Sequence, residues 1–223
     1  MTDAERQALL EVMGIPNWTL RCPLPGLVSE PGPVESPWDA LEARVRECNR
    51  CPLHAGRTQT VFGTGSREAD WLIIGEAPGE QEDLQGEPFV GRAGQLLNEM
   101  IRALGLTRSG VYIANILKCR PPDNRDPSPE EARACEGYLH QQIGLIQPAI
   151  ILAVGRVAAQ NLLQTTVAIG KLRGTVHEYR GVPLIVTYHP AYLLRAPLEK
   201  RKAWDDLKLA LKIYRTPKNQ IVT

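Results

Sequence analysis

The chain has 223 residues, of which 43% are hydrophobic and 23% charged, and its formal net charge is +1. This composition is typical of a globular protein large enough for one sizeable α/β domain or two small ones. No apolar run approaches the roughly 18 residues that a membrane span needs, and the N-terminus is acidic rather than signal-like. The sequence therefore argues against a membrane protein and against a secreted one.

The charges are unevenly distributed along the chain. Residues 1–47 carry eight acidic and four basic side chains, whereas residues 165–223 carry eleven basic and four acidic ones. A basic C-terminal region is compatible with a face that binds a polyanion such as nucleic acid, and a solvated helix surface is the alternative. Charge alone leaves both interpretations open.

The N-terminal segment differs from the rest of the chain. A short helix is predicted over residues 3–13, and residues 23–37 contain five prolines and two glycines. Because proline lacks a backbone donor and interrupts helices, this stretch is predicted to be a linker or an extended arm. We therefore divide the chain into an N-terminal helix with a proline-rich arm, residues 1–37, and a main domain, residues 38–223.

The main domain alternates short apolar runs with helical patterns. Strands are predicted at residues 71–75, 111–115, 149–154 and 183–188. Helices are predicted at residues 39–47, 94–104, 128–146, 156–163 and 199–214. This alternation is typical of a three-layer α/β/α fold, in which a mostly parallel four-stranded central sheet is flanked by helices.

Polar residues follow the ends of three predicted strands. Gly75 and Glu76 lie at the end of the first strand, Asn115 ends the second, and His189 follows the fourth. An asparagine amide offers a donor and an acceptor together, which suits a nucleobase edge, and a histidine can donate to a developing oxyanion. Taken singly, the asparagine could cap a turn and the histidine could be structural. The combination is more specific, because ligands of such sheets bind where the carboxyl ends of the strands meet.

Two glycine-containing loops flank these residues. Residues 75–83 combine two glycines and a proline with four carboxylates, so exposed backbone amides could hold a polar ligand there. An acidic surface turn is the alternative. Phe89 lies in the second loop, residues 86–94, where it could stack on a planar ligand or serve as a buried anchor.

The chain has five cysteines. Cys48 and Cys51 form a C-x-x-C pair, and Cys119 and Cys135 complete a set of four from three segments. A disulfide framework is not expected in a cytosolic protein, whereas four thiolates fit either zinc or an iron–sulfur cluster. Scattered free thiols are the remaining alternative. Cys22 lies in the proline-rich arm and is expected to be a free thiol.

Four stretches resemble the motifs of the family 4 uracil-DNA glycosylases. They are GEAPG at 75–79, FVGRAG at 89–94, NILKCRPP at 115–122 and HPAYLLR at 189–195. The resemblance covers roughly residues 45–215 and extends to the pattern of four cysteines. It implies an enzyme that breaks the N-glycosidic bond of deoxyuridine in DNA, releasing free uracil and leaving an abasic site. It also implies a 4Fe–4S cluster.

The same resemblance implies roles for individual residues at a uracil pocket. Phe89 would stack on the uracil ring, and Asn115 would pair with its N3–H and O4, which also explains the rejection of cytosine. Gly75 and Ala77 would belong to the pocket wall. Thymine differs from uracil only by its C5 methyl group, so a part of the chain must close that side of the pocket. Independently of the resemblance, we expect the loop of residues 79–83 to do so.

Catalysis would involve a histidine and a carboxylate. His189 and the backbone N–H groups of Glu76 and Ala77 would stabilise negative charge at uracil O2. A carboxylate would position water, for which Glu76 is ranked first, with Glu82 and Asp83 as alternatives.

The remaining expectations concern the cluster, the DNA and the cell. Cys48, Cys51, Cys119 and Cys135 would hold the cluster, which would be structural. Lys171, Arg173 and Arg195 would contact phosphates of uracil-containing DNA, single- or double-stranded. The protein is expected to act as a monomer in a prokaryotic cytoplasm, associated with the nucleoid.

Two rival functions remain open. One is covalent trapping of uracil-DNA through a histidine, as in one relative of this family. That relative has glutamine at the position of Ala77. It also has a longer basic loop than residues 170–176 of this chain. The other is a four-cysteine zinc protein that binds DNA without chemistry. It would leave four residues without a role: Glu76, Phe89, Asn115 and His189.

Overall fold

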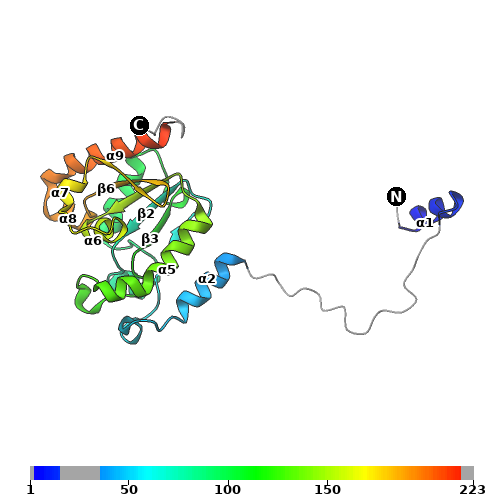
Figure 1. The fold of residues 1–223 in the computed structure, drawn as a ribbon, viewed down its shortest axis with the longest axis horizontal. Coiled ribbons are helices and arrows are strands. Elements are labelled where there is room, and N and C mark those ends of the chain that lie inside the picture. Colours follow the sequence, from blue (N-terminus) through cyan, green and yellow to red (C-terminus); the bar gives the residue numbers. More distant parts are fainter. Residues whose placement is uncertain (1–2, 16–35, 217–223) are drawn as a thin grey trace. The chain divides into compact units, whose positions relative to one another are not determined.

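The computed structural model describes residues 3–15 and 36–216 (Figure 1). Its contacts divide the chain into two units, residues 1–35 and 36–223. In the first unit the predicted helix is present as α1 (Asp3–Val12), while Cys22 and most of the proline-rich arm lie outside the described residues. Residue 37 belongs to the second unit and not to the arm, because proline suits the first position of a helix.

The second unit is built on one sheet with the strand order β1-β3-β2-β4-β6-β5. Its centre is the predicted parallel set: β2 (Trp71–Gly75), β3 (Tyr112–Asn115), β4 (Ile150–Val154) and β6 (Val182–Thr187). Two antiparallel edge strands, β1 (Thr64–Gly65) and β5 (Val176–Tyr179), make the sheet six-stranded rather than four-stranded. Sequence patterns missed them because β1 has two residues and β5 has no buried residue.

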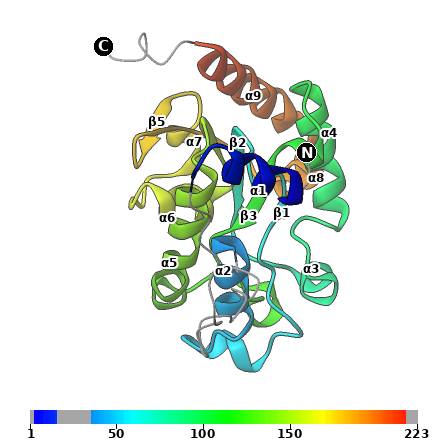
Figure 2. The ribbon, with the colours of Figure 1, turned by 90° about the vertical axis from the view of Figure 1, so that its right-hand side faces the viewer.

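Helices cover both faces of the sheet, which confirms the three-layer fold. One face is covered by α5 (Pro129–Ile146), α6 (Arg156–Leu162) and α7 (Ile169–Leu172). The other is covered by α4 (Arg92–Ala103), α8 (Pro190–Arg195) and α9 (Lys200–Arg215). Figure 2 shows α5 and α6 on one side of the sheet and α4 and α8 on the other. Every residue of β2 is buried, since alternate side chains enter the two cores.

Two further helices and four short turns complete the described part of the second unit. α2 (Pro37–Arg46) packs beside α5, and α3 (Glu80–Gln85) follows β2. Residues 79–83, expected to be a loop, are therefore mostly helical. Single 3₁₀ turns occupy Pro52–Ala55, Arg108–Gly110, Pro122–Asn124 and Pro197–Glu199. Among the described helices none is long and apolar enough to cross a membrane.

Candidate active site

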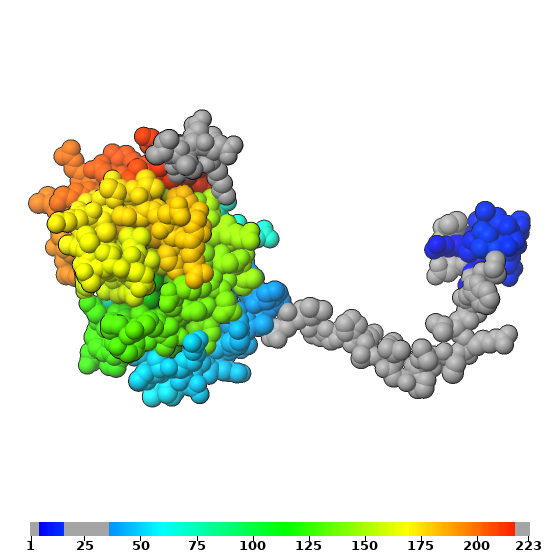
Figure 3. All heavy atoms as spheres, viewed as in Figure 1, coloured from blue at the N-terminus to red at the C-terminus, as the bar shows by residue number. Residues whose placement is uncertain are grey.

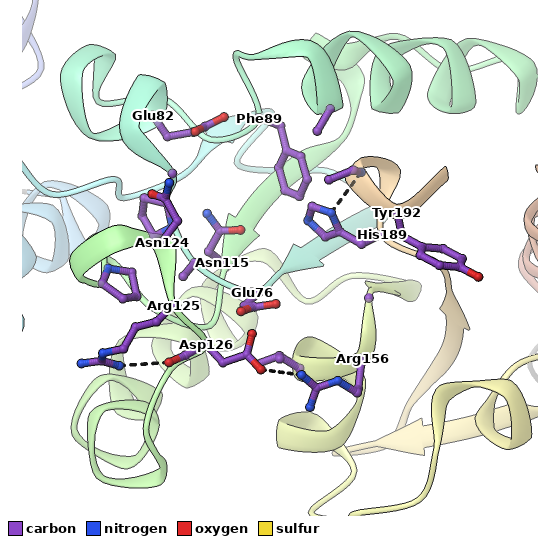
Figure 4. Close-up of a pocket in the computed structure, with 18 of the residues that line it drawn as sticks. Glu76, Glu82, Phe89, Asn115, Asn124, Arg125, Asp126, Arg156, His189 and Tyr192 are labelled. Atoms are coloured by element: carbon purple, nitrogen blue, oxygen red, sulfur yellow. Dashed lines mark hydrogen bonds and ion pairs between the residues drawn. The ribbon is translucent and has the colours of Figure 1, made fainter. Parts of the chain in front are cut away.

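A cleft of about 840 Å³ lies at the carboxyl ends of the parallel strands. Its walls include Glu76 after β2, Asn115 at the end of β3, Arg156 after β4 and His189 after β6. Figure 4 shows these side chains gathered around the same space. The structure thus brings together the three polar groups that the strand-end pattern placed in one crevice.

Glycines allow Phe89 to pack tightly beside Asn115. A Cβ atom on Gly75 would lie 2.4 Å from Asn115 Oδ1 and 2.6 Å from Phe89 Cζ, so a side chain there would displace both groups. A Cβ atom on Gly94, at the start of α4, would lie 1.7 Å from the Phe89 carbonyl oxygen. The Phe89 ring is 6% exposed, and its centroid lies 5.6 Å from that of the His189 ring. Phe89 is therefore a buried, fixed wall of the cleft.

The Asn115 amide is buried and incompletely paired. The residue is 2% exposed, and its Oδ1 atom accepts no hydrogen bond from the described residues. Its backbone carbonyl accepts from Lys118 Nζ at 3.0 Å, which fixes the end of β3. Leaving a buried acceptor unpaired costs about 1–3 kcal/mol. Because Asn115 lines the cleft, an N–H group of a bound ligand could pair with Oδ1 and remove this cost.

His189 is held as a neutral donor. It caps the N-terminus of α8, where its Nδ1 atom accepts from the Ala191 backbone N–H at 3.2 Å. Burial, together with the nearby charge of Arg195, lowers the pKa of His189 to about 4, against a smaller opposing effect of Glu82. A neutral ring that accepts at Nδ1 carries its proton on Nε2. The imidazole is thus suited to donate a hydrogen bond without carrying a charge.

Two of the three candidate carboxylates are engaged with backbone amides. Glu82 Oε1 accepts from Val90 N at 3.1 Å and so ties α3 to the Phe89 loop. Asp83 is 2% exposed and accepts from Thr58 N at 2.9 and 3.0 Å. Both carboxylates therefore hold loops in place around the cleft.

Glu76 differs from them because its carboxyl group lies beside the ion pair of Asp126 and Arg156. Burial raises the pKa of Glu76 to about 7, the Asp126 carboxylate adds to this, and Arg156 opposes it. Asp126 itself pairs with Arg156 (Figure 4). Neither partner of Glu76 was predicted from the sequence. The strand-end pattern could have found Arg156, which follows β4, whereas Asp126 lies in an irregular segment without a pattern.

The three basic residues predicted to contact phosphate are in different surroundings. Arg195 is exposed and lines the cleft, and Lys171 is exposed on α7, outside the residues that line the cleft. The Arg173 side chain is 10% exposed and pairs with the buried carboxylate of Asp206 at 2.8 Å. Because its charge is neutralised inside the domain, Arg173 does not suit a phosphate contact.

The four predicted ligand cysteines come from three separate segments of the sequence and lie around one small pocket. Cys48, Cys51, Cys119 and Cys135 all line it, and none forms a disulfide. Within the described residues, no three His, Cys, Asp or Glu side chains are already placed as a metal-binding group.

Donors to sulfur surround this pocket. Cys119 Sγ accepts from Arg57 Nη1 at 3.1 Å, and Cys135 Sγ accepts from the Lys118 backbone N–H at 3.3 Å. Arg50 and Lys118 also line the pocket. Burial raises the pKa of the Cys119 and Cys135 thiols, and these donors and positive charges oppose it because they stabilise the thiolates. The donor set and its surroundings therefore fit a thiolate-bound metal centre.

Comparison with known proteins agrees with this geometry. Residues 62–208 match the family described as the uracil DNA glycosylase superfamily. A type-4 uracil-DNA glycosylase of Archaeoglobus fulgidus is 44% identical over 178 residues, which cover 76% of this chain and 89% of that protein. One of Thermotoga maritima is 45% identical over 159 residues, covering 70% and 83% respectively.

A type-5 uracil-DNA glycosylase of Thermus thermophilus is more distant, at 33% identity over 153 residues, 58% of this chain and 68% of that protein. The type-4 relatives are thus both more similar and matched over more of their length. The chain belongs to the uracil DNA glycosylase superfamily and, within it, to the type-4 uracil-DNA glycosylases.

Proposed function

We propose that the protein is a DNA-repair glycosylase that flips uracil out of DNA and hydrolyses its N-glycosidic bond. The products are free uracil and an abasic site. One observation carries the proposal: the unpaired Oδ1 of buried Asn115 lies in the same cleft as the Phe89 ring and the neutral His189. The similarity to type-4 uracil-DNA glycosylases supports it.

Recognition follows from the Asn115 amide. Uracil presents an N3–H donor beside the O4 acceptor, which match Oδ1 and Nδ2 of an asparagine. Cytosine presents an acceptor at N3 and a donor at N4, so the same amide would face two mismatched groups. Unpaired buried polar groups discriminate strongly between such ligands. Phe89 would stack on the ring. Gly75 leaves room for the Asn115 and Phe89 side chains, and Ala77 lines the cleft.

Asn115→Asp is expected to transfer activity from uracil to cytosine. Burial favours a protonated carboxyl group, which would donate to cytosine N3 and accept from N4–H. We expect uracil excision to fall by about 10- to 100-fold, with slow cytosine excision appearing. Strand scission after alkali on matched uracil and cytosine oligonucleotides measures both. Loss of uracil excision with no gain on cytosine would contradict this assignment of Asn115.

The chemistry needs charge stabilisation on both fragments. As the bond breaks, negative charge develops on uracil and positive charge on the sugar. His189 Nε2–H and the backbone N–H groups of Glu76 and Ala77 would donate to uracil O2. Glu76, the carboxylate not engaged with loop amides, would position the attacking water and stabilise the sugar cation.

We further propose that Cys48, Cys51, Cys119 and Cys135 hold a 4Fe–4S cluster. The cluster would be structural, because four thiolate ligands leave no open coordination position and hydrolysis needs no redox step. The cysteines would join residues 48–51, the segment after β3 and helix α5 into one unit.

Iron and acid-labile sulfide should be present in protein purified without oxygen, at about four of each per chain. Cys135→Ser is expected to reduce both contents and to lower the thermal stability, because a ligand is lost. Cys22→Ser, outside the set of four, should change neither. Zinc in place of iron, or equal effects of the two substitutions, would contradict the cluster assignment.

DNA would lie across the mouth of the cleft, with Arg195 and Lys171 near its phosphates. Binding should weaken steeply with salt if several phosphates are contacted. We propose a monomer that acts in the cytoplasm of a prokaryotic cell, at the nucleoid, where its substrate is found. Residues 1–35 would form an appendage to this catalytic domain.

The two products provide a direct test of the proposed reaction. Chromatography of the released base and counting of aldehyde-reactive abasic sites should give equal amounts from uracil-containing DNA. A protein–DNA adduct that survives denaturation, without free uracil, would instead indicate a covalent trap.

A further inference from the structure

The cleft extends beyond the residues assigned to uracil. Its volume of about 840 Å³ is far larger than one pyrimidine, and its walls include Tyr188 and Tyr192. Figure 4 shows the Tyr192 ring beyond His189, away from Asn115 and Glu76. Tyr192 is 38% exposed although it lines the cleft, so part of its ring is accessible there. We call Tyr188 and Tyr192 the tyrosine ledge.

The ledge is supported from behind. The rings of Tyr188 and Tyr192 lie 5.0 Å apart at 48°. The Arg173 guanidinium lies 4.4 Å from the centre of the Tyr188 ring, and its ion pair with Asp206 anchors it to α9. Figure 3 shows the surfaces of α7 (yellow) and α9 (orange) adjoining. Arg173 therefore holds the ledge in position, which gives this buried cation a role without any phosphate contact.

An exposed, supported aromatic ring beside a DNA-binding cleft has a specific use. Proteins that bind single-stranded nucleic acid stack bases on such rings, whatever the base, because every base has a π-face. A base inside a duplex is already stacked and paired, so it has little to gain from the ledge. An unpaired base next to the flipped uracil would gain the full contact.

We propose that the tyrosine ledge binds the nucleobase adjacent to uracil, stacked on Tyr192, and that the enzyme thereby favours uracil in unpaired DNA. The proposal rests on the proposed function, since it places the ledge beside a flipped uracil. It adds a second base subsite whose occupant is a neighbouring nucleotide of any sequence. Arg195, exposed on the same helix, is placed to contact the phosphate between the two.

The test removes the Tyr192 ring by mutation and the neighbouring base by omitting it from the oligonucleotide. Each is removed alone, and both are removed together. Binding of wild type and Tyr192→Ala is measured on single-stranded oligonucleotides that carry one 2′-fluoro-deoxyuridine, which resists hydrolysis. A second and a third oligonucleotide lack the base immediately 5′ or 3′ of it. Binding is read by fluorescence anisotropy, so it does not depend on turnover.

We expect Tyr192→Ala to weaken binding of the complete strand by roughly 5- to 100-fold. On the strand that lacks the stacked base it should weaken binding by less than twofold. Tyr192→Phe keeps the ring and should retain this coupling. Trp204→Ala removes another partly exposed aromatic side chain, on α9 outside the cleft lining, and should leave the coupling intact.

Equal weakening on all three strands, or none, would overturn the ledge proposal. Uracil excision by the wild type, measured alongside, keeps the two proposals separate. If uracil is excised but the ring and the base show no coupling, only the ledge fails. If uracil is not excised, the proposed function fails as well.

Discussion

His189→Ala is expected to lower the single-turnover rate of uracil excision by about 10²- to 10³-fold while changing DNA affinity little. The substitution removes the Nε2–H donor that we place at uracil O2. Because the pKa of His189 is lowered to about 4, the ring is neutral at physiological pH, and donation rather than charge is lost. A donor aimed at developing charge contributes mainly in the transition state, so the rate should respond more than binding.

His177→Ala provides a matched control. His177 lies on the edge strand β5, where its Nε2 atom contacts the Leu172 carbonyl oxygen at 2.7 Å, outside the cleft lining. We expect it to leave the single-turnover rate within about twofold of wild type. Equal losses of rate and of DNA affinity in His189→Ala would refute the role at the uracil anion.

Glu76→Gln is expected to reduce the single-turnover rate by about 10²- to 10⁴-fold and to change its pH dependence. The pKa of Glu76 is raised to about 7, chiefly by burial, so the carboxylate is protonated below this pH. The ionised form positions water, and the wild-type rate should therefore rise through about pH 7 and level off above it. Near pH 6 roughly one tenth of the maximum rate is expected. The glutamine variant should show no such rise.

Two further variants test the origin of this pH dependence. Asp126→Asn removes a neighbouring negative charge and should shift the rise to lower pH, because Arg156 then favours ionised Glu76. Glu80→Gln, on the exposed side of α3, should leave the profile unchanged. A rise that persists in Glu76→Gln would assign the titration to another group and contradict the role of Glu76.

Much of the fold followed from apolar runs between glycines and polar turns. The run at 71–75 has the bounds of β2, and the four predicted strands form the parallel centre of the sheet. Buried central strands give such runs because both faces are covered. The edge strands β1 and β5 and the helix α3 are short and partly exposed, so tertiary contacts rather than local pattern determine them.

From the sequence, site residues could be predicted only where their position relative to a strand end places them. Three site residues lie at strand ends: Glu76, Asn115 and His189. The carboxyl ends of parallel strands lie at the same edge of the sheet, whatever the conformation of the loops, so these residues share one cleft. The choice among Glu76, Glu82 and Asp83 depended on hydrogen bonds to distant amides, which no local pattern contains. Arg173 was assigned to phosphate for the same reason: its partner Asp206 lies 33 residues away in sequence.

The central claim is hydrolysis of uracil from DNA at the Asn115–His189 cleft. The most direct measurement is alkaline scission of an end-labelled oligonucleotide that carries one uracil, with otherwise identical thymine and cytosine strands. We predict scission at the uracil position alone by the wild type, and at least a hundredfold less with His189→Ala in the same reaction time. Intact uracil strands with the wild type, or undiminished scission with His189→Ala, would contradict the account.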